Sequence, residues 1–270
     1  EVFSGFVAAA AEAGQNTTVF ALPDWGPAGA ARLPALCDGR IDGLLLLAPL
    51  LAPEAALALP GHTPFVSVHA NHALPGVPDL EPDEEAGAHA MVARLIALGH
   101  RRILHLGGPA GLTGADRRAA GYLRAHAEAG LVPLPGGLLR GSYDPQAGRQ
   151  ALEAWLQQHQ GEAAPQAVFA ANDAVALGCL EALAARGWRV PDDVSVAGFD
   201  DTVVAHAAGL STVRQPLQQM GREAAALLLA HVEARHGGPA VAAPAQRVFA
   251  TELVPGRTVA APRRSVLRIN

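Results

Sequence analysis

The chain of 270 residues contains no lysine, since all 20 of its basic residues are arginine. Without a lysine side chain, neither a Schiff base nor the phosphate-binding lysine of a P-loop can form, so both kinds of site are excluded. Charge is also scarce: charged residues make up only 17% of the chain, and the net charge is −5. Binding of DNA or RNA requires a surface with clustered basic residues, so we do not expect this chain to bind nucleic acid by itself.

Cysteines are few, and long apolar runs are missing. Cys37 and Cys179 are far apart and lie in no metal-ligand spacing, which is typical of buried thiols in a reducing compartment. The longest apolar run, GLLLLAPLLAP, is too short to span a bilayer and is broken by proline. The opening EVFSGFVAAAAEAG has neither the positive region nor the cleavage site of a signal peptide. We therefore expect a cytoplasmic protein that makes no contact with a membrane.

The chain is rich in hydrophobic residues, and these occur in a regular pattern of segments. Hydrophobic residues make up 50% of the sequence, and short apolar runs alternate with longer, alanine-rich amphipathic segments. This alternation predicts parallel sheets covered by helices on both faces, and two such sheets fit the chain better than one. The expected strands are 17–22, 43–48, 64–68, 102–107, 167–170, 194–199 and 246–254, and the expected helices are 2–13, 28–37, 86–98, 113–128, 145–158, 175–186 and 217–234. The proline- and acid-rich stretch 73–85 is expected to be a linker, and the tail 263–270 to be frayed.

A glycine-rich loop, GGPAGLTGAD, follows the expected strand 102–107 and raises the question of nucleotide binding. A P-loop would need a lysine followed by Ser or Thr, and the sequence has Asp116 and Arg117 there. Glycines at 107, 108, 111 and 114 do not match the G-x-G-x-x-G spacing of a dinucleotide loop either. Thr113 and Asp116 instead fit a capping box, which predicts that a helix begins here.

Two arginines of this predicted helix, Arg117 and Arg118, then lie at the carboxyl end of a parallel strand. Open α/β sheets bind ligands at that edge, although position alone leaves a surface arginine equally open. Asp200 and Asp201 follow the expected strand 194–199 and could form a metal-binding or acid–base pair. Without a third carboxylate we favour a turn with a single ligand contact.

Other catalytic and metal-binding patterns are weak or missing in the sequence. No G-x-S-x-G elbow of a hydrolase occurs. The eleven histidines are scattered, and His69 and His72 lie in a loop rather than on one helix face. We expect no metal, no cofactor and no catalysis.

Seven stretches of the sequence, taken together, point to a known family. They occur in the family's order and cover nearly the whole chain: IDGLLLLAP, LIALGHRRILHLGGP, ADRRAAGYLRAHAEAGL, VFAANDAVALGCLEAL, RVPDDVSVAGFDDT, LSTVRQPLQQMGREAAALL and ELVPGRTVAAP. The combination resembles the effector-binding core of the lactose-repressor (LacI/GalR) family of bacterial transcription regulators.

The resemblance implies a fold and a domain organisation. The fold would be α/β, with two Rossmann-like subdomains of the periplasmic-binding-protein type I, each with a parallel sheet, and a ligand cleft between them. Residues 1–81 and 217–250 would form the N-terminal subdomain, residues 82–216 and 251–262 the C-terminal one, and 263–270 a tail. The family's DNA-binding headpiece, its hinge helix and the first strand of its core are expected upstream of Glu1.

The resemblance also implies ligand-binding residues. Arg118, three positions before the glycine of the GY pair, matches the arginine that grasps the ligand, and Asp200 matches the aspartate that accepts from ligand hydroxyls or amines. Asn172 matches a polar cleft residue, and Tyr143 stands where members place an aromatic platform. Two further cleft positions depart from the family: His69 stands where many members have an aspartate, and Leu47 replaces a residue that is sometimes polar.

The function implied by the resemblance is sensing of a small molecule, such as a sugar or sugar derivative, by a homodimer. Ligand binding would control operator DNA binding by a headpiece upstream of this chain. Because the fold is shared, an extracytoplasmic sugar-binding protein of a transporter is the alternative. An enzyme with its active site between two α/β lobes is the third possibility.

Overall fold

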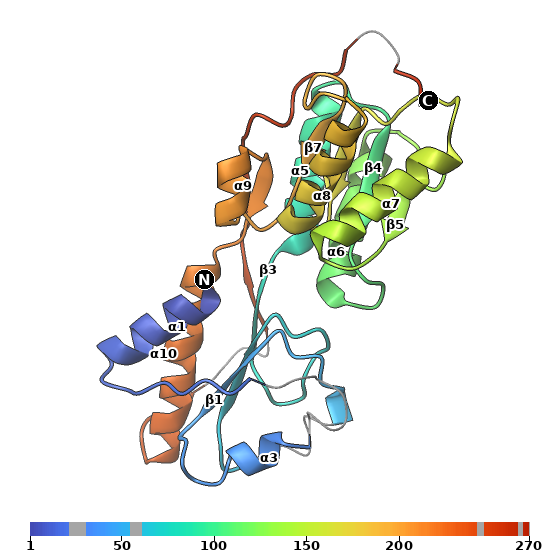
Figure 1. The fold of residues 1–270 in the computed structure, drawn as a ribbon. Helices are drawn as coiled ribbons and strands as arrows, with labels where there is room; N and C mark the ends of the chain where they lie inside the picture. Colours follow the sequence, from blue (N-terminus) through green and yellow to red (C-terminus); the bar gives the residue numbers. More distant parts are fainter. Residues whose placement is uncertain (22–30, 55–60, 242–245, 264–266, 270) are drawn as a thin grey trace. The chain divides into compact units, whose positions relative to one another are not determined.

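The computed structural model describes residues 1–270 apart from 22–30, 55–60, 242–245, 264–266 and 270 (Figure 1). The chain divides into two compact units. Unit 1 consists of Glu1–Pro82 and Pro216–Phe249, and unit 2 of Asp83–Gln215 and Ala250–Asn270. Each unit has a four-stranded parallel sheet, which confirms the predicted α/β class.

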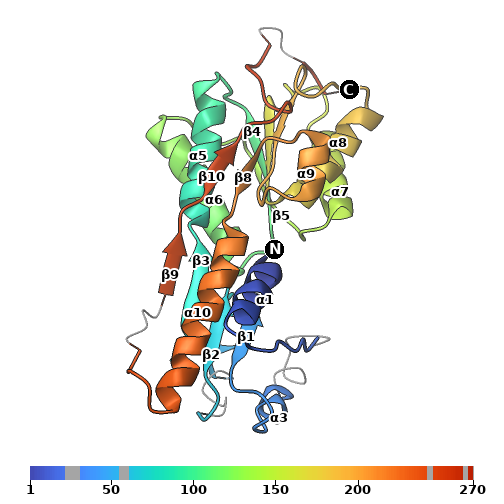
Figure 2. The same cartoon turned by 90° about the vertical axis from the view of Figure 1, so that its left-hand side faces the viewer.

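Unit 1 is built on a sheet with the strand order β1-β2-β3-β9. Its elements are α1 (Val2–Glu12), α3 (Leu33–Leu36), β1 (Leu44–Leu47), β2 (Phe65–Val68), β3 (Asp79–Pro82), α10 (Leu217–Arg235) and β9 (Gln246–Phe249). Helices α1 and α10 lie side by side (Figure 2). Met220 and Leu228 of α10 pack on Val66, Val68 and Leu80 of the sheet. This face of the sheet is therefore closed by the helix pair.

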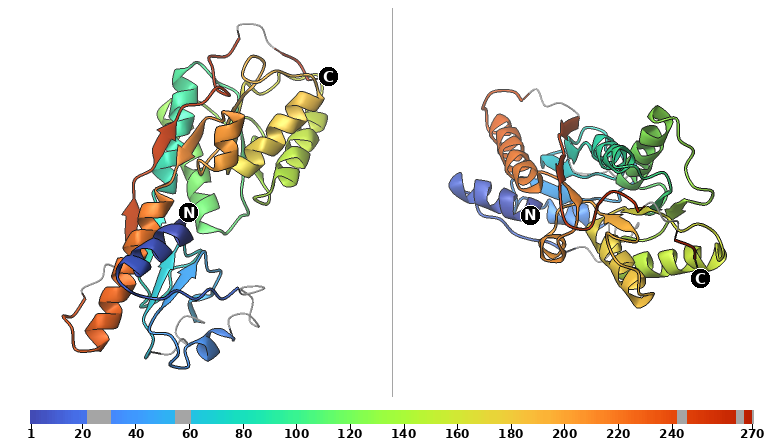
Figure 3. Two further views of the ribbon diagram at one scale, coloured as in Figure 1. Left: turned by 60° about the vertical axis from the view of Figure 1, so that its left-hand side comes forward. Right: turned by 90° about the horizontal axis from the view of Figure 1, so that it is seen from above.

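Unit 2 is built on a sheet with the strand order β5-β4-β6-β7. Its elements are α5 (Glu84–Ala97), β4 (Ile103–Gly107), α6 (Thr113–Glu128), β5 (Leu138–Arg140), α7 (Pro145–Gln158), β6 (Ala167–Ala170), α8 (Asp173–Ala185), β7 (Ser195–Ala197), α9 (Val203–Ala208), β8 (Thr212–Arg214) and β10 (Glu252–Val254). Strands β8 and β10 form a separate antiparallel pair. Helices α5 and α6 cover one face of the four-stranded sheet, and α7 and α8 cover the other (Figure 3).

The central strand β4 shows why a continuous apolar run folds in this place. All five of its residues are buried. Leu104 and Leu106 pack with α7 and α8, whereas Ile103 packs with α5 and α6. Successive side chains of a strand point to opposite faces, so a strand between two helix layers needs apolar residues at nearly every position.

The expected strand at 17–22 does not form. Residues 17–21 have no regular secondary structure, and Leu22 lies outside the described residues. Of the expected helix 28–37, residues 28–30 also lie outside the described residues, and the rest forms only the short helix α3. A strand is stabilised by a neighbouring strand, and among the described residues β1 pairs with β2 alone. The segment 17–20 and strand β1 instead both line a cavity of about 520 Å³ within unit 1.

The expected linker at 73–85 does contain the passage from unit 1 to unit 2, between Pro82 and Asp83, but it is not a free linker, because it also contains the buried strand β3. This strand lies between β2 and β9 in the middle of the sheet. Its polar side chains are satisfied: Asp79 accepts a hydrogen bond of 3.2 Å from the Ala70 N–H, and Glu81 accepts one from the Gln246 side chain. Partners on neighbouring segments thus allow an acidic, proline-containing sequence to occupy a central strand.

The last expected strand and the tail also differ from the prediction. The stretch 246–254 forms two strands, β9 in unit 1 and β10 in unit 2. Described residues of the tail are not frayed: the Ala164 N–H donates to the Leu267 carbonyl at 2.9 Å, and Ile269 is only 2% exposed. Apolar burial against the α7–α8 side of unit 2 holds this part of the tail in place.

A buried histidine occupies the middle of β4. The ring of His105 is stacked between those of Tyr122 and Phe169, with centroid distances of 5.2 and 4.9 Å. Its Nδ1 donates to the Phe169 carbonyl at 2.9 Å. Burial lowers the pKa of His105 from 6.5 to about 4, because removal from water penalises the charged ring more than this hydrogen bond favours it.

His105 should make the stability of the protein fall at acid pH. Between pH 6.5 and about 4 the unfolded chain holds the His105 proton more often than the folded protein does, so the free energy of unfolding decreases as the pH falls. We expect a contribution of about 3 kcal/mol, complete above pH 6.5 and lost near pH 4. The free energy of unfolding, measured by urea denaturation, should differ less between about pH 8 and about pH 5 in His105→Leu than in the wild type. The exposed His206→Gln is the matched control, and an undiminished difference in His105→Leu would contradict the assignment.

Candidate functional site

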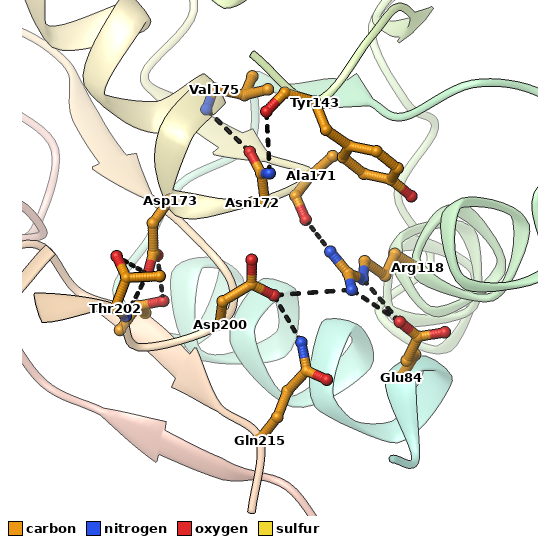
Figure 4. Close-up of polar contacts among 11 residues, drawn as sticks. Glu84, Arg118, Tyr143, Ala171, Asn172, Asp173, Val175, Asp200, Thr202 and Gln215 are labelled. Atoms are coloured by element: carbon orange, nitrogen blue, oxygen red, sulfur yellow. Dashed lines mark hydrogen bonds and ion pairs between the residues drawn. The ribbon is translucent and has the colours of Figure 1, made fainter. Parts of the chain in front are cut away.

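Four of the residues singled out in the sequence gather in unit 2 at one edge of its sheet (Figure 4). Arg118 lies in α6, which follows β4, and Tyr143 lies between β5 and α7. Asn172 lies between β6 and α8, and Asp200 follows β7. Because these strands are parallel, all four residues lie beyond the carboxyl ends of strands, where α/β sheets bind ligands.

The glycine-rich loop makes room for this group of side chains. A Cβ at residue 108 would lie 2.5 Å from the ring atoms of Tyr143, so only glycine lets the tyrosine approach. Gly111 has φ +84°, which suits the turn, and its N–H donates to Asp116 at 3.1 Å. Helix α6 begins at Thr113 and its N-cap is Leu112, so the predicted capping by Thr113 is wrong. The loop is a turn that admits a side chain.

Arg118 is the most connected of the four residues. Its side chain is 6% exposed. Its Nε and Nη2 donate to Glu84 at 3.2 and 2.7 Å, and its Nη1 donates to the Ala171 carbonyl. Nη2 also lies 3.7 Å from an oxygen of Asp200, and the guanidinium stacks 4.1 Å from the ring centroid of Phe199. Arg118 therefore joins α6 to the start of α5 and to the segments after β6 and β7.

The charges around Arg118 decide its ionisation. Burial lowers the pKa of a guanidinium, but the carboxylates of Glu84 and Asp200 outweigh that effect and raise the pKa of Arg118. Arg118 thus remains a cation in a buried place. Glu84 was missed by the sequence analysis because it lies in the acidic stretch that was interpreted as a linker.

Tyr143 and Asn172 hold each other's positions. Asn172 is the N-cap of α8: its Oδ1 accepts from the Val175 N–H at 2.8 Å, and its Nδ2 donates to the Tyr143 carbonyl at 3.1 Å. Burial raises the pKa of the Tyr143 phenol, which keeps a neutral hydroxyl at physiological pH. This pair offers an aromatic face and a hydroxyl donor in a fixed loop.

Asp200 and Asp201 form the turn that the sequence analysis favoured. Their φ values are 113° and 61°, in the left-handed region that non-glycine residues rarely adopt. Asp200 accepts from the Gln215 side chain, and Asp201 accepts from the Arg214 Nε at 2.7 Å. These contacts oppose the strain and fix the direction of the Asp200 carboxylate. Gln215 directly follows β8, and the sequence analysis did not single it out, although it lies within the stretch LSTVRQPLQQMGREAAALL.

Asp173 is a buried anchor beneath this turn. One carboxylate oxygen accepts from the Thr202 N–H at 2.7 Å and from its hydroxyl at 3.0 Å. The other accepts from the Thr212 hydroxyl at 2.6 Å. Burial raises the pKa of Asp173 although these three donors act in the opposite direction. Asp173 holds the start of α9, immediately after Asp200 and Asp201, against β8.

The remaining two residues, Leu47 and His69, belong to unit 1. Leu47 ends β1 and is 38% exposed. His69 follows β2 with φ 62°, and its N–H donates to the Leu80 carbonyl at 3.0 Å. Both lie beyond or at the carboxyl ends of parallel strands, as the four residues of unit 2 do.

The described part of the chain has neither a cluster of metal-binding side chains nor a helix that could span a membrane. There, no group of three or more His, Cys, Asp or Glu side chains could hold a metal ion. Nor does any helix combine the length and the apolar character that crossing a membrane requires.

Replacing Asp173 should destabilise the protein. Asp173→Asn leaves buried donors of Thr202 and Thr212 without an anionic acceptor, so we expect the free energy of unfolding to fall by about 2–3 kcal/mol. Asp192→Asn is the control, since it removes a half-exposed surface charge and should change the free energy by less than about 1 kcal/mol. Urea denaturation followed by circular dichroism measures both, and equal stabilities would refute the anchoring role.

Comparisons with known proteins agree with this architecture. The sequence profile of the periplasmic binding protein-like domain matches residues 92–259. The HTH-type transcriptional repressor CytR of Escherichia coli K12 is 33% identical over 203 residues, and these residues cover 74% of this chain and 58% of CytR. The chain therefore spans somewhat more than half the length of that relative.

Solved structures extend the similarity to nearly the whole chain. A LacI family transcriptional regulator from Mycobacterium smegmatis superposes with a TM-score of 0.81 at 31% identity, over 97% of this chain and 94% of the other. The transcriptional regulator CelR, solved with cellobiose, gives a TM-score of 0.81 at 29% identity, over 96% and 78%. The predicted resemblance to the LacI/GalR effector-binding core is confirmed, and the chain belongs to the family of periplasmic-binding-protein-like domains.

Proposed function

We propose that the chain is the ligand-sensing part of a LacI-type transcription regulator and that it performs no catalysis. The observation that carries this proposal is the charged group Arg118–Glu84–Asp200, placed beside Tyr143 at the carboxyl edge of a parallel sheet. The curated relative CytR is a repressor, and CelR was solved with a sugar. Both similarities support a regulator that senses a small molecule.

The chemistry of the group suits a polyhydroxylated ligand. Asp200 supplies a charged acceptor for hydroxyl or amine groups, and Tyr143 supplies an apolar face with a hydroxyl donor. Sugars combine hydroxyl rims with apolar faces, so we propose a sugar or sugar derivative as the effector. Asn172 keeps Tyr143 in place, and Arg118 orients the two carboxylates.

In the proposed mechanism the two units are the two subdomains of the core. Leu47 and His69 of unit 1 are further candidates for contact with the ligand. A ligand shifts the equilibrium between two arrangements only by the difference in its affinity for them. That difference would alter operator binding by an upstream helix-turn-helix headpiece in a cytoplasmic homodimer.

Transport is the alternative function that shares this fold. An extracytoplasmic binding protein would bind the sugar in the same way but would pass it to a membrane transporter. The similarity to CytR and to the Mycobacterium regulator favours transcription regulation.

Replacing Arg118 should abolish effector binding. A thermal-shift screen of sugars, nucleosides and small acids identifies a ligand, and calorimetry then measures its affinity. We expect Arg118→Ala to weaken binding by at least roughly 100-fold, since Asp200 and Glu84 lose the cation that orients them. Because this change leaves Glu84 as a buried unpaired charge, the double variant Arg118→Met/Glu84→Gln tests the same loss in a neutral setting. Arg124→Ala, an exposed arginine of the same helix, is the control, and unchanged affinity in both Arg118 variants would refute the site.

The full-length regulator should bind a palindromic operator as a dimer. A twofold-symmetric dimer places its two DNA-binding headpieces on two half-sites. Selection of binding sequences from random DNA in vitro should therefore recover a palindrome. Fluorescence anisotropy with and without the screened ligand should show a change in operator affinity of roughly 5-fold or more. A monomer in ultracentrifugation that binds no selected DNA would count against regulation.

A further inference from the structure

The donors of Arg118 are largely engaged by the protein itself. A guanidinium carries five N–H groups. The Nε of Arg118 donates to Glu84, Nη2 donates to Glu84 and lies 3.7 Å from Asp200, and Nη1 donates to the Ala171 carbonyl. A ligand with a carboxylate or phosphate would normally be held by a bidentate arginine fork. Here the edge of the fork formed by Nε and Nη2 faces Glu84.

Glu84 is fixed in this position by the fold. Its side chain is 3% exposed, and it stands in the first turn of α5. Its carboxylate also lies against the first turn of α6, where a Cβ at residue 114 would come within 2.6 Å of both carboxylate oxygens. Gly114 thus leaves the space that Glu84 needs, and the positive ends of two helix dipoles favour a negative charge there.

The charges at the centre of the site do not sum to a positive value. One guanidinium is opposed by two carboxylates, those of Glu84 and Asp200, which gives a net charge of −1. An anionic ligand would have to displace Glu84 from Arg118 and then remain close to two carboxylates. A neutral polyol, or a ligand with an amine, meets no such repulsion and can donate to Asp200.

We propose that Glu84 is a specificity-determining residue that makes the site reject anions, such as sugar phosphates and sugar acids, in favour of neutral or amine-bearing polyols. This inference rests on the proposed function, because it concerns the ligand of the same site. In this arrangement Arg118 acts as an internal counter-ion that orients Glu84 and Asp200.

Inorganic phosphate is a probe that tests the proposal without knowledge of the effector. Calorimetry at low ionic strength compares its affinity for the wild-type chain and for Glu84→Gln, which keeps the shape of the side chain and removes its charge. We expect Glu84→Gln to bind phosphate at least roughly tenfold more tightly than wild type, because the fork of Arg118 is released and the site becomes neutral. Adding Arg118→Met to Glu84→Gln should remove that gain.

Two further variants separate the role of Glu84 from a general change in charge. Glu128→Gln removes one exposed carboxylate from the far end of α6, the helix that carries Arg118, and should leave phosphate binding unchanged. Gly114→Ala keeps every charge but pushes the Glu84 carboxylate from its place, so it should increase phosphate binding in the same direction as Glu84→Gln. Circular dichroism and urea denaturation show whether each variant is folded.

The outcomes distinguish this inference from the proposed function. If folded Glu84→Gln binds phosphate no better than wild type, or if Glu128→Gln gains as much, the specificity role of Glu84 is refuted whatever the effector is. If the compound screen finds no ligand, the proposed function fails while the phosphate comparison stands. For any neutral sugar that binds, its phosphate ester should bind the wild-type chain at least roughly tenfold more weakly, and Glu84→Gln should narrow that gap.

Discussion

The organisation of unit 2 at the carboxyl edge of its sheet depends on the hydrogen bonds and ion pairs of the buried Arg118 guanidinium. The guanidinium connects α6 to Glu84 at the start of α5, to the carbonyl of Ala171 after β6 and to Asp200 after β7. Burying a charge is costly, and the cost is offset only when partners with good geometry surround it. Arginine suits this place because its planar, permanently charged group can donate in several directions and stack on Phe199.

Small residues give these charged groups their room. Gly108 admits the ring of Tyr143, Gly114 admits the carboxylate of Glu84, and a Cβ at Gly198 would collide with Asp173. Gly108 and Gly114 are among the glycines that made the segment after β4 resemble a phosphate-binding loop. Their role in the structure is to let side chains from other segments approach the backbone, which explains why their spacing matches no nucleotide-binding motif.

The sequence predicted well those parts of the fold that local patterns determine. Helix α7 and strand β6 have the predicted bounds, because a capped amphipathic run and a fully apolar run are both local signals. Strand β3 was missed because its stability comes from neighbours that are distant in sequence, such as Gln246. The prediction of a strand at 17–22 was wrong for the opposite reason, since residues 17–21 pair with no strand in the described part of the chain. The short elements β5, β8 and α9 gave too little periodicity to be recognised.

The site shows the same division between local and distant signals. Motifs led to Arg118, Tyr143, Asn172 and Asp200, which lie together in unit 2. The partners that set the charge of this group, above all Glu84, carry no motif, because an ion pair across 34 positions leaves no local trace. The net charge of the group around Arg118 therefore could not be predicted from the sequence and is seen only in the structure.

The rigidity of this group bears on how a ligand could act. Asp200 is held in a strained turn by Asp173, Thr202 and Gln215, so it needs little ordering when a ligand arrives. A pre-ordered site gives affinity, but it favours no particular arrangement of the protein by itself. Under the proposed function, the difference between arrangements must then come from residues outside this rigid group. The group around Arg118 would decide which ligand is bound, and residues outside it would decide how binding changes the equilibrium between the arrangements.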